Sequence, residues 1–128
     1  MKTTSMTPQD WLPLTPAVFH ILLSLTDGER HGYAIMREVA ESTNRQINLG
    51  PGTLYGTIKR LLNAGMIEES DERPDAAEDD ERRRYYRLTG LGRHVVEAEA
   101  CRYNEVAKLV QRKRLAGKLT KIVPAGGI

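Results

Sequence analysis

Five polar side chains between residues 53 and 63 fall on one face of a predicted helix. They are Thr53, Tyr55, Lys59, Arg60 and Asn63. The opposite face carries an apolar stripe with helical spacing, from Leu54 to Leu62. Hydroxyl, amide and cationic groups on one helix can donate hydrogen bonds to base edges and to phosphate oxygens. The face is therefore a candidate contact for a nucleic acid, although an ordinary solvated helix face fits this segment as well.

A second group of cations lies in a short run that alternates like a strand. Arginines flank two adjacent tyrosines, Tyr85 and Tyr86, on both sides. Because successive side chains of a strand point to opposite faces, we expect one tyrosine to pack on the helices. We also expect Arg83 or Arg84 to contact a phosphate. The alternative is that these arginines pair with the acidic segment at residues 71–81, which carries seven carboxylates.

Three aromatic residues are candidates for an effector-binding site: Trp11, Phe19 and Tyr103. Each lies on an element that we expect near the centre of a dimer. A pocket formed there could stack a flat aromatic small molecule. Packing of the interface alone explains the same three residues equally well, so both interpretations stay open.

The residue types that carry catalysis or bind metals form no recognisable site. There is no serine–histidine–aspartate arrangement or paired-carboxylate motif, and Gly50-Pro51-Gly52-Thr53 lacks the lysine of a Walker loop. The histidines, His20, His31 and His94, are too scattered for a metal site. We therefore expect neither an enzyme nor a cofactor or metal ion. Cys101, the only cysteine, is expected to be a small interface residue.

The composition is that of an ordinary soluble protein. The chain has 128 residues, of which 40% are hydrophobic and 28% charged, with a formal net charge of +2. It is long enough for one core and too apolar for a disordered protein. The N-terminal residues do not have the pattern of a signal peptide, and no apolar run reaches the roughly 20 residues of a membrane span. The single cysteine excludes an internal disulfide, so we expect a cytoplasmic location.

The helices that would position these residues begin and end at strong signals. Thr15-Pro16 starts a first helix that is apolar nearly all round. A second helix is predicted from about His31 to Thr43. The third helix starts at or after Pro51, and Gly65 is its expected end.

A hairpin and a long helix follow. The strand-like runs at residues 66–69 and 83–88 form the hairpin. The last helix has too many apolar positions for a solvated helix and too few for burial all round, which favours a homodimer. The predicted fold class is therefore mainly α with a small β-hairpin, a winged helix-turn-helix with a long C-terminal dimerisation helix. The predicted units are an N-terminal arm (1–14), a winged-helix DNA-binding domain (15–89), a dimerisation helix (90–115) and a flexible tail (116–128).

Several short motifs, in this order, resemble those of the PadR family of bacterial transcriptional regulators. They are His31-Gly32-Tyr33, Gly52-Thr53-Leu54-Tyr55, Lys59-Arg60-Leu61 with Gly65-Met66-Ile67, and Arg84-Tyr85-Tyr86-Arg87-Leu88-Thr89 with Gly92. With one helix after the hairpin, the chain resembles the short subclass of that family. The resemblance implies a homodimeric repressor of nearby genes that binds a pseudo-palindromic operator in double-stranded DNA. Release by a small hydrophobic or aromatic effector is implied for some members only.

Two features depart from the family pattern. Gly56 stands where many relatives carry a larger residue, and a glycine inside a helix costs about 1 kcal/mol relative to alanine. The loop of the wing is acidic, so phosphate would repel its tip. The acidic wing leaves open an alternative function, a winged-helix module that binds proteins and has lost DNA binding.

Overall fold

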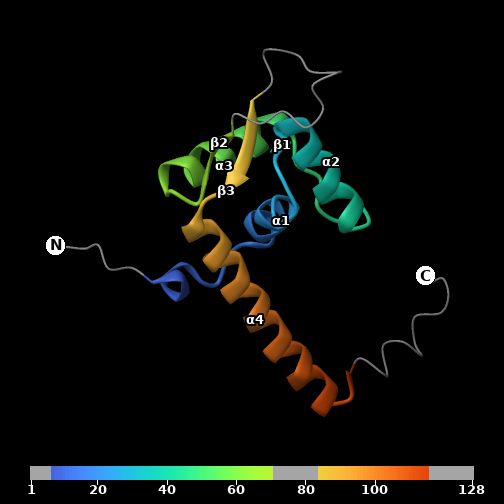
Figure 1. Cartoon of the computed structure of the whole chain (residues 1–128). Helices are drawn as coiled ribbons and strands as arrows, with labels where there is room; N and C mark the ends of the chain where they lie inside the picture. Colours follow the sequence, from blue (N-terminus) through green and yellow to red (C-terminus); the bar gives the residue numbers. More distant parts are fainter. Residues whose placement is uncertain (1–6, 71–83, 116–128) are drawn as a thin grey trace.

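The computed structural model of the chain describes residues 7–70 and 84–115. Figure 1 shows short helices and a small sheet packed together, with a long helix that projects away from them. The elements, in chain order, are η1 (Pro8–Trp11), α1 (Pro16–Ser24), β1 (Arg30–His31), α2 (Gly32–Ser42), α3 (Pro51–Asn63), β2 (Ile67–Ser70), β3 (Tyr85–Leu88) and α4 (Gly90–Arg112). The predicted mainly α winged fold with a long terminal helix is confirmed.

The helices begin where capping chemistry places them. The Thr15 hydroxyl accepts a hydrogen bond from the Val18 N–H, and Thr89 does the same for the N–H of Gly92. The predicted starts of α1 and α4 are therefore correct. Pro51 occupies the first turn of α3, where a missing N–H costs nothing. Gly65 has φ +79°, a left-handed conformation that favours glycine at a helix end.

The sheet has three antiparallel strands in the order β1-β3-β2. The predicted hairpin is β2 paired with β3, with Ile67 opposite Leu88. The short strand β1 was not predicted; it adds to the other edge of β3 and pairs His31 with Tyr85. The expectation that one tyrosine of β3 packs on the helices is confirmed by Tyr86, which belongs to the core; Tyr85 is buried as well. The Tyr85 ring meets the ring of His31 from β1 edge-on, at 5.3 Å between centroids.

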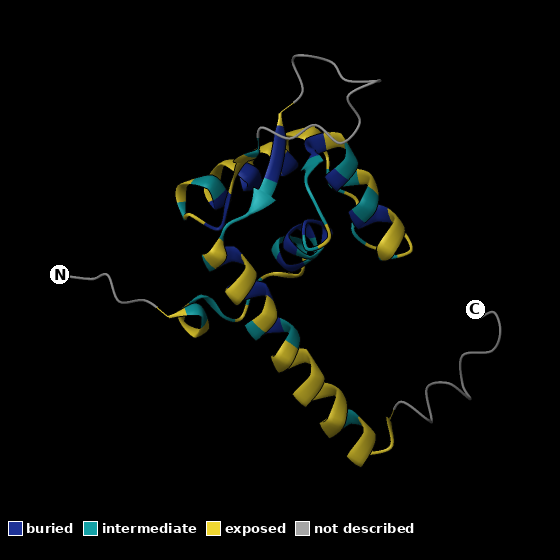
Figure 2. Cartoon of the chain, viewed as in Figure 1, coloured by how far each residue is buried: buried dark blue, intermediate teal, exposed yellow. Residues whose placement is uncertain are grey.

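The core lies where α1, α2, α3, the sheet and the first part of α4 meet, and the dark blue residues of Figure 2 mark it. Helix α1 is buried on more than one side, as its apolar sequence predicts. The cluster comprises Phe19, Ile21, Leu22, Leu25, Ile35, Val39, Leu54, Ile58, Leu61, Met66, Ile67, Tyr86, Val95 and Val96. Helices α2 and α3 each present one apolar face to it, which leaves their other faces open to a partner.

Helix α4 changes its surroundings along its length. Its first three turns lie against the core and η1, whereas residues 101–109 are all exposed. Figure 2 shows this second part in yellow, extending away from the rest of the chain. Among its exposed residues are Tyr103, Val106 and Leu109. Within the described ranges, no helix is long and apolar enough to cross a membrane.

Candidate nucleic-acid interface

Helix α3 turns one face to the core and the opposite face to solvent. Leu54, Thr57, Ile58 and Leu61 are buried. The five residues predicted to contact DNA, Thr53, Tyr55, Lys59, Arg60 and Asn63, are all exposed. Apart from the neighbouring residues and backbone of its own helix, a methyl group added at Gly56 would meet no atom of the described residues within 4 Å. The outward face of α3 is therefore narrow in its middle and carries polar groups on both sides of this gap.

The two cations of α3 differ in their surroundings. The Arg60 guanidinium donates a hydrogen bond of 3.1 Å to the hydroxyl of Thr57, one turn earlier on the same helix. Lys59 takes part in no ion pair within the described part of the chain. Its ammonium group is therefore available to a phosphate without breaking an existing contact.

The wing is the hairpin of β2 and β3 with the segment that joins them. Its base carries arginines that already form ion pairs. Arg84 lies 3.2 Å from a carboxylate oxygen of Glu69, and Arg87 lies 2.9 Å from one of Glu68. Both glutamates belong to β2, the strand next to β3. Arg83 and the acidic segment at residues 71–81 lie outside the described residues. Both described pairs are largely exposed, so each is worth only about 0–1 kcal/mol and a phosphate can replace the carboxylate.

A tyrosine between these two regions has a perturbed acidity. Burial raises the pKa of the Tyr86 phenol, and the neighbouring groups Glu69 and Tyr55 raise it further, while Arg84 opposes them. Tyr86 belongs to β3 and Tyr55 to α3. The Tyr55 phenol of α3 is thus one of the groups that raise the pKa of Tyr86.

Sequence reasoning missed a second exposed aromatic residue beside this face. Tyr33 lies in the first turn of α2 and is 54% exposed, and the guanidinium of Arg37 stacks over its ring at 5.5 Å from the centroid. Both residues line a concavity of about 280 Å³ together with Arg45 and Asn48, which precede α3. The signal was an aromatic residue in the first turn of the helix that precedes α3, where solvent exposure is otherwise unexpected.

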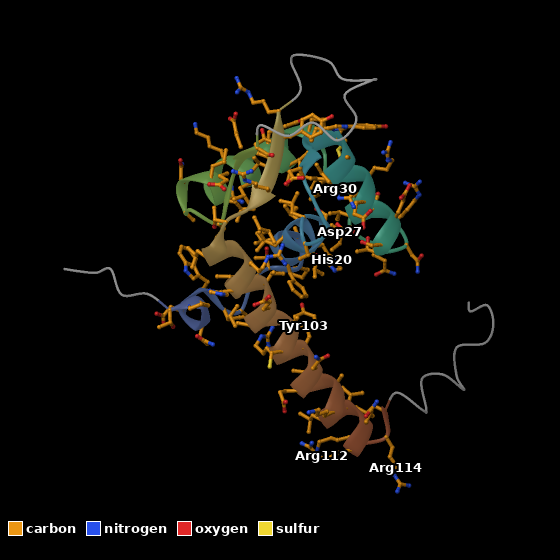
Figure 3. All side chains as sticks on the ribbon, in the orientation of Figure 1. His20, Asp27, Arg30, Tyr103, Arg112 and Arg114 are labelled. Atoms are coloured by element: carbon orange, nitrogen blue, oxygen red, sulfur yellow. The ribbon has the colours of Figure 1, made fainter. Side chains whose placement is uncertain are left out.

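The three candidate effector residues are only partly brought together. Phe19 is buried in α1, and its ring centroid lies 4.7 Å from that of Tyr103 on α4. Figure 3 shows Tyr103 where α4 passes the end of α1. Trp11 packs against the core from η1, with a buried Nε1 that has no hydrogen-bond partner in the described chain. A groove of about 710 Å³ runs between η1 and α4, but none of the three aromatic residues lines it.

A buried carboxylate that sequence reasoning also missed ties the N-terminal segment to α4. The Glu99 side chain is fully buried and accepts a 2.9 Å hydrogen bond from the Leu14 N–H. It also accepts hydrogen bonds of 2.6 and 3.2 Å from Arg102. The hydrogen bond from Arg102 holds the pKa of Glu99 below its ordinary value, burial opposes this shift, and the Leu14 N–H adds to it. This contact fixes the segment between η1 and α1 on the surface of α4.

The histidines and the cysteine considered from the sequence form no metal site or disulfide within the described residues. Nδ1 of His31 accepts a hydrogen bond from the Ala34 N–H and so caps α2. Across residues 7–70 and 84–115, no three histidine, cysteine or acidic side chains are grouped to hold a metal ion. Cys101 is exposed on α4 and has no disulfide partner.

Comparison with known sequences agrees with this architecture. The profile of the "Transcriptional regulator PadR-like family" matches residues 21–98. The chain belongs to the PadR family. The match runs from α1 through the sheet and into α4, and it ends where α4 leaves the core. PadR family proteins are transcriptional regulators and not enzymes.

Individual relatives extend the comparison. A transcriptional regulator of Mycobacterium tuberculosis is 34% identical over 91 residues, which are 71% of this chain and 78% of the relative. An uncharacterized 37.1 kDa protein in a transposon of Streptomyces fradiae is 36% identical over 80 residues. That match spans 62% of this chain but only 21% of the transposon protein.

A solved structure shows the same fold. The PadR family transcription regulator from Clostridium difficile superimposes with a TM-score of 0.61 at 24% identity. The alignment covers 77% of this chain and 97% of that one. At this identity the likeness concerns the fold, and it supports the winged helix described above.

Proposed function

We propose that this PadR family member binds double-stranded DNA through α3, which enters the major groove, and represses nearby genes. The observation that carries the proposal is the outward face of α3, where Thr53, Tyr55, Lys59 and Asn63 are exposed around Gly56. These side chains offer the hydroxyl, cationic and amide groups that read base edges and hold phosphates. The absence of a side chain at Gly56 leaves room for the DNA backbone to approach the helix closely. We infer a cytoplasmic location because the proposed partner is DNA.

The wing contributes a positioning contact in this proposal. Arg84 and the neighbouring Arg83 belong to the run that leads into β3, beside the helix that reads the bases. The Arg84 side chain is 67% exposed and forms a surface ion pair with Glu69, which salt and phosphate weaken. A phosphate contact there orients the protein on the duplex without reading its sequence.

The proposed DNA complex contains two copies of the chain, joined through α4. At 3.6 residues per turn, the buried stripe of Gly92, Val95 and Glu99 continues along α4 to Tyr103 and Val106. The continued stripe is exposed in the single chain. A second α4 packed against it would bury these residues. Two copies related by a twofold axis would place two α3 helices on a pseudo-palindromic operator.

A gel-shift assay tests DNA binding, with an operator selected from a random pool of duplexes. We expect the double variant Tyr55→Ala/Lys59→Ala to lose operator affinity at least tenfold, since each contact is worth about 1 kcal/mol or more. Lys108→Ala is the matched control, because Lys108 is an exposed lysine of α4 that pairs with Glu105. Unchanged operator affinity in the double variant would refute the assignment of α3.

The dimer and its symmetry have separate tests. We expect Leu109→Asp to produce monomers in sedimentation experiments, because it buries an unpaired carboxylate in the proposed interface. We also expect the selected operator to contain two half-sites about one helical turn apart. A monomeric wild-type protein, or a site without twofold symmetry, would contradict the proposal.

Repression and its release complete the proposed function. The contact of Phe19 with a half-exposed Tyr103 is the observation that favours an aromatic effector, and Trp11 offers a fluorescence signal nearby. We expect the wild-type protein to silence a reporter gene placed behind its operator. An aromatic ligand that quenches Trp11 fluorescence should also lower operator affinity. Quenching with unchanged operator affinity would exclude this regulation.

The alternative of a winged-helix module that binds proteins is favoured by one observation, the ion pairs of Arg84 and Arg87 with β2. If those pairs persist, the wing has little net charge to offer a phosphate. Operator affinity that falls steeply with added salt would exclude this alternative, because such a fall reports cations displacing counterions from DNA.

A further inference from the structure

The ring of Tyr55 lies across the first residue of α2, Gly32. A Cβ atom built at Gly32 would lie 2.4 Å from the Tyr55 hydroxyl oxygen and 2.7 Å from two of its ring carbons. Non-bonded carbon atoms prefer separations of about 3.5–4.0 Å. Any residue other than glycine at position 32 would therefore displace the Tyr55 ring or the backbone of α2.

The backbone at Gly32 is held too firmly to be the part that moves. The preceding residue, His31, pairs with Tyr85 in the sheet, and its ring meets the Tyr85 ring edge-on at 5.3 Å. Nδ1 of His31 also accepts the hydrogen bond from Ala34 that caps α2. A shift of Gly32 would break these contacts together. Tyr55 is 49% exposed, so its side chain can yield at lower cost.

The position of the Tyr55 ring matters because it joins three elements. The ring extends from α3 and lies against the start of α2. Its phenol interacts electrostatically with that of Tyr86 on β3, the strand at the base of the wing. The ring of Tyr55 therefore lies against α2, and its phenol acts electrostatically on β3.

We propose that Gly32 is a positioning residue for DNA recognition, which seats the Tyr55 ring against α2 and so fixes where its hydroxyl meets the DNA. This inference rests on the proposed function of α3. A tyrosine held in place before binding loses less side-chain freedom on contact, and it reaches base edges with a defined geometry. The glycine thus acts on operator choice without touching DNA.

The experiment compares four proteins: wild type, Gly32→Ala, Tyr55→Ala and the double variant. For each, affinity is measured for the selected operator and for an unrelated duplex, and the ratio of the two reports discrimination. We expect Gly32→Ala to lower this ratio about fivefold or more, with little change in affinity for the unrelated duplex. In the Tyr55→Ala background, Gly32→Ala should have no further effect on discrimination.

Gly90→Ala is the matched control, because Gly90 is the first residue of α4, as Gly32 is of α2, and an added methyl there meets nothing within 4 Å. An unchanged ratio in Gly32→Ala would overturn the inference. So would an equal loss in both backgrounds, or a Gly32→Ala protein whose folding is not restored by Tyr55→Ala. A wild-type protein that does not prefer its operator would instead refute the proposed function itself.

Discussion

The two halves of α4 have the same kind of sequence and opposite surroundings. In the first half, Val95 and Val96 belong to the common core and Glu99 is fully buried. In the second half, Tyr103, Val106 and Leu109 are 42–47% exposed. Figure 3 shows the second half extending beyond Tyr103, whose ring meets that of Phe19 on α1, to Arg112 at its far end. The stripe of the helix is continuous, so the change lies in what the rest of the chain supplies to cover it.

This difference separates two roles of one helix. The first half stabilises the winged helix, because it closes the core beneath α1 and the sheet. Beyond the contact of Tyr103 with Phe19, the second half contributes little to the fold of a single chain. Its exposed apolar residues remain available for a second copy. Substitutions in the two halves should therefore affect different measurements.

The largest effect on folding is expected from Gly92→Ala. A Cβ at Gly92 would lie 1.9 Å from the carbonyl oxygen of Met66, a backbone atom that also accepts a hydrogen bond from the Thr89 N–H. Overpacking of this kind costs about 1–3 kcal/mol, and the rigid backbone partner puts this case at the upper end. Urea denaturation measures the loss, and Gly90→Ala is the control. Unaltered stability would show that the start of α4 is not fixed against the α3–β2 turn.

A matched pair of valines compares the two halves directly. Val95→Ala removes a fully buried side chain and should cost about 2 kcal/mol. Val106→Ala removes the same atoms from a 47% exposed position and should change single-chain stability by less than about 0.5 kcal/mol. The gain in helix propensity is the same in both, so it cancels. Denaturation at high dilution measures both; equal losses would contradict the division of α4.

Glu99→Ala tests the contact between α4 and the N-terminal segment. The substitution leaves the Leu14 N–H without its acceptor and removes the partner of Arg102. A buried donor left unpaired costs about 1–3 kcal/mol. Glu97→Ala, on the exposed side of the same turn, should cost much less. Similar losses in the two variants, measured by thermal unfolding, would show that the Glu99 contact does not stabilise the fold.

Acid should weaken the same contact. The Arg102 hydrogen bond holds the pKa of Glu99 below its ordinary value of 4.5. Because the pKa is lower in the folded state, the contact adds stability above about pH 4.5, and this is lost as the pH falls through the folded pKa. The difference in unfolding free energy between wild type and Glu99→Gln should shrink between about pH 7 and about pH 3. A difference independent of pH would contradict the ionised state of Glu99.

Much of the architecture could be predicted from local sequence signals. The starts of α1 and α4, and the glycine that ends α3, depend on residues within one helical turn, so they were read correctly. The exposed face of α3 followed from the spacing of its apolar residues. The two-residue strand β1 was missed, because Arg30 and His31 become a strand only by pairing with β3, more than fifty positions later. The burial of the second tyrosine of β3, Tyr85, was missed for the same reason, because it packs against His31.

Sequence alone determined the helices, the hairpin and the polar face of α3, because periodicity and capping are properties of neighbouring residues. Only the tertiary structure decided which parts of these elements meet. It placed Tyr55 over Gly32, paired Arg84 with Glu69, and buried Glu99 against Leu14. These contacts join residues that are 15 to 85 positions apart in the sequence. Gly32 and Tyr55, for example, lie on separate helices. Such contacts depend on how whole elements pack, which no local pattern encodes.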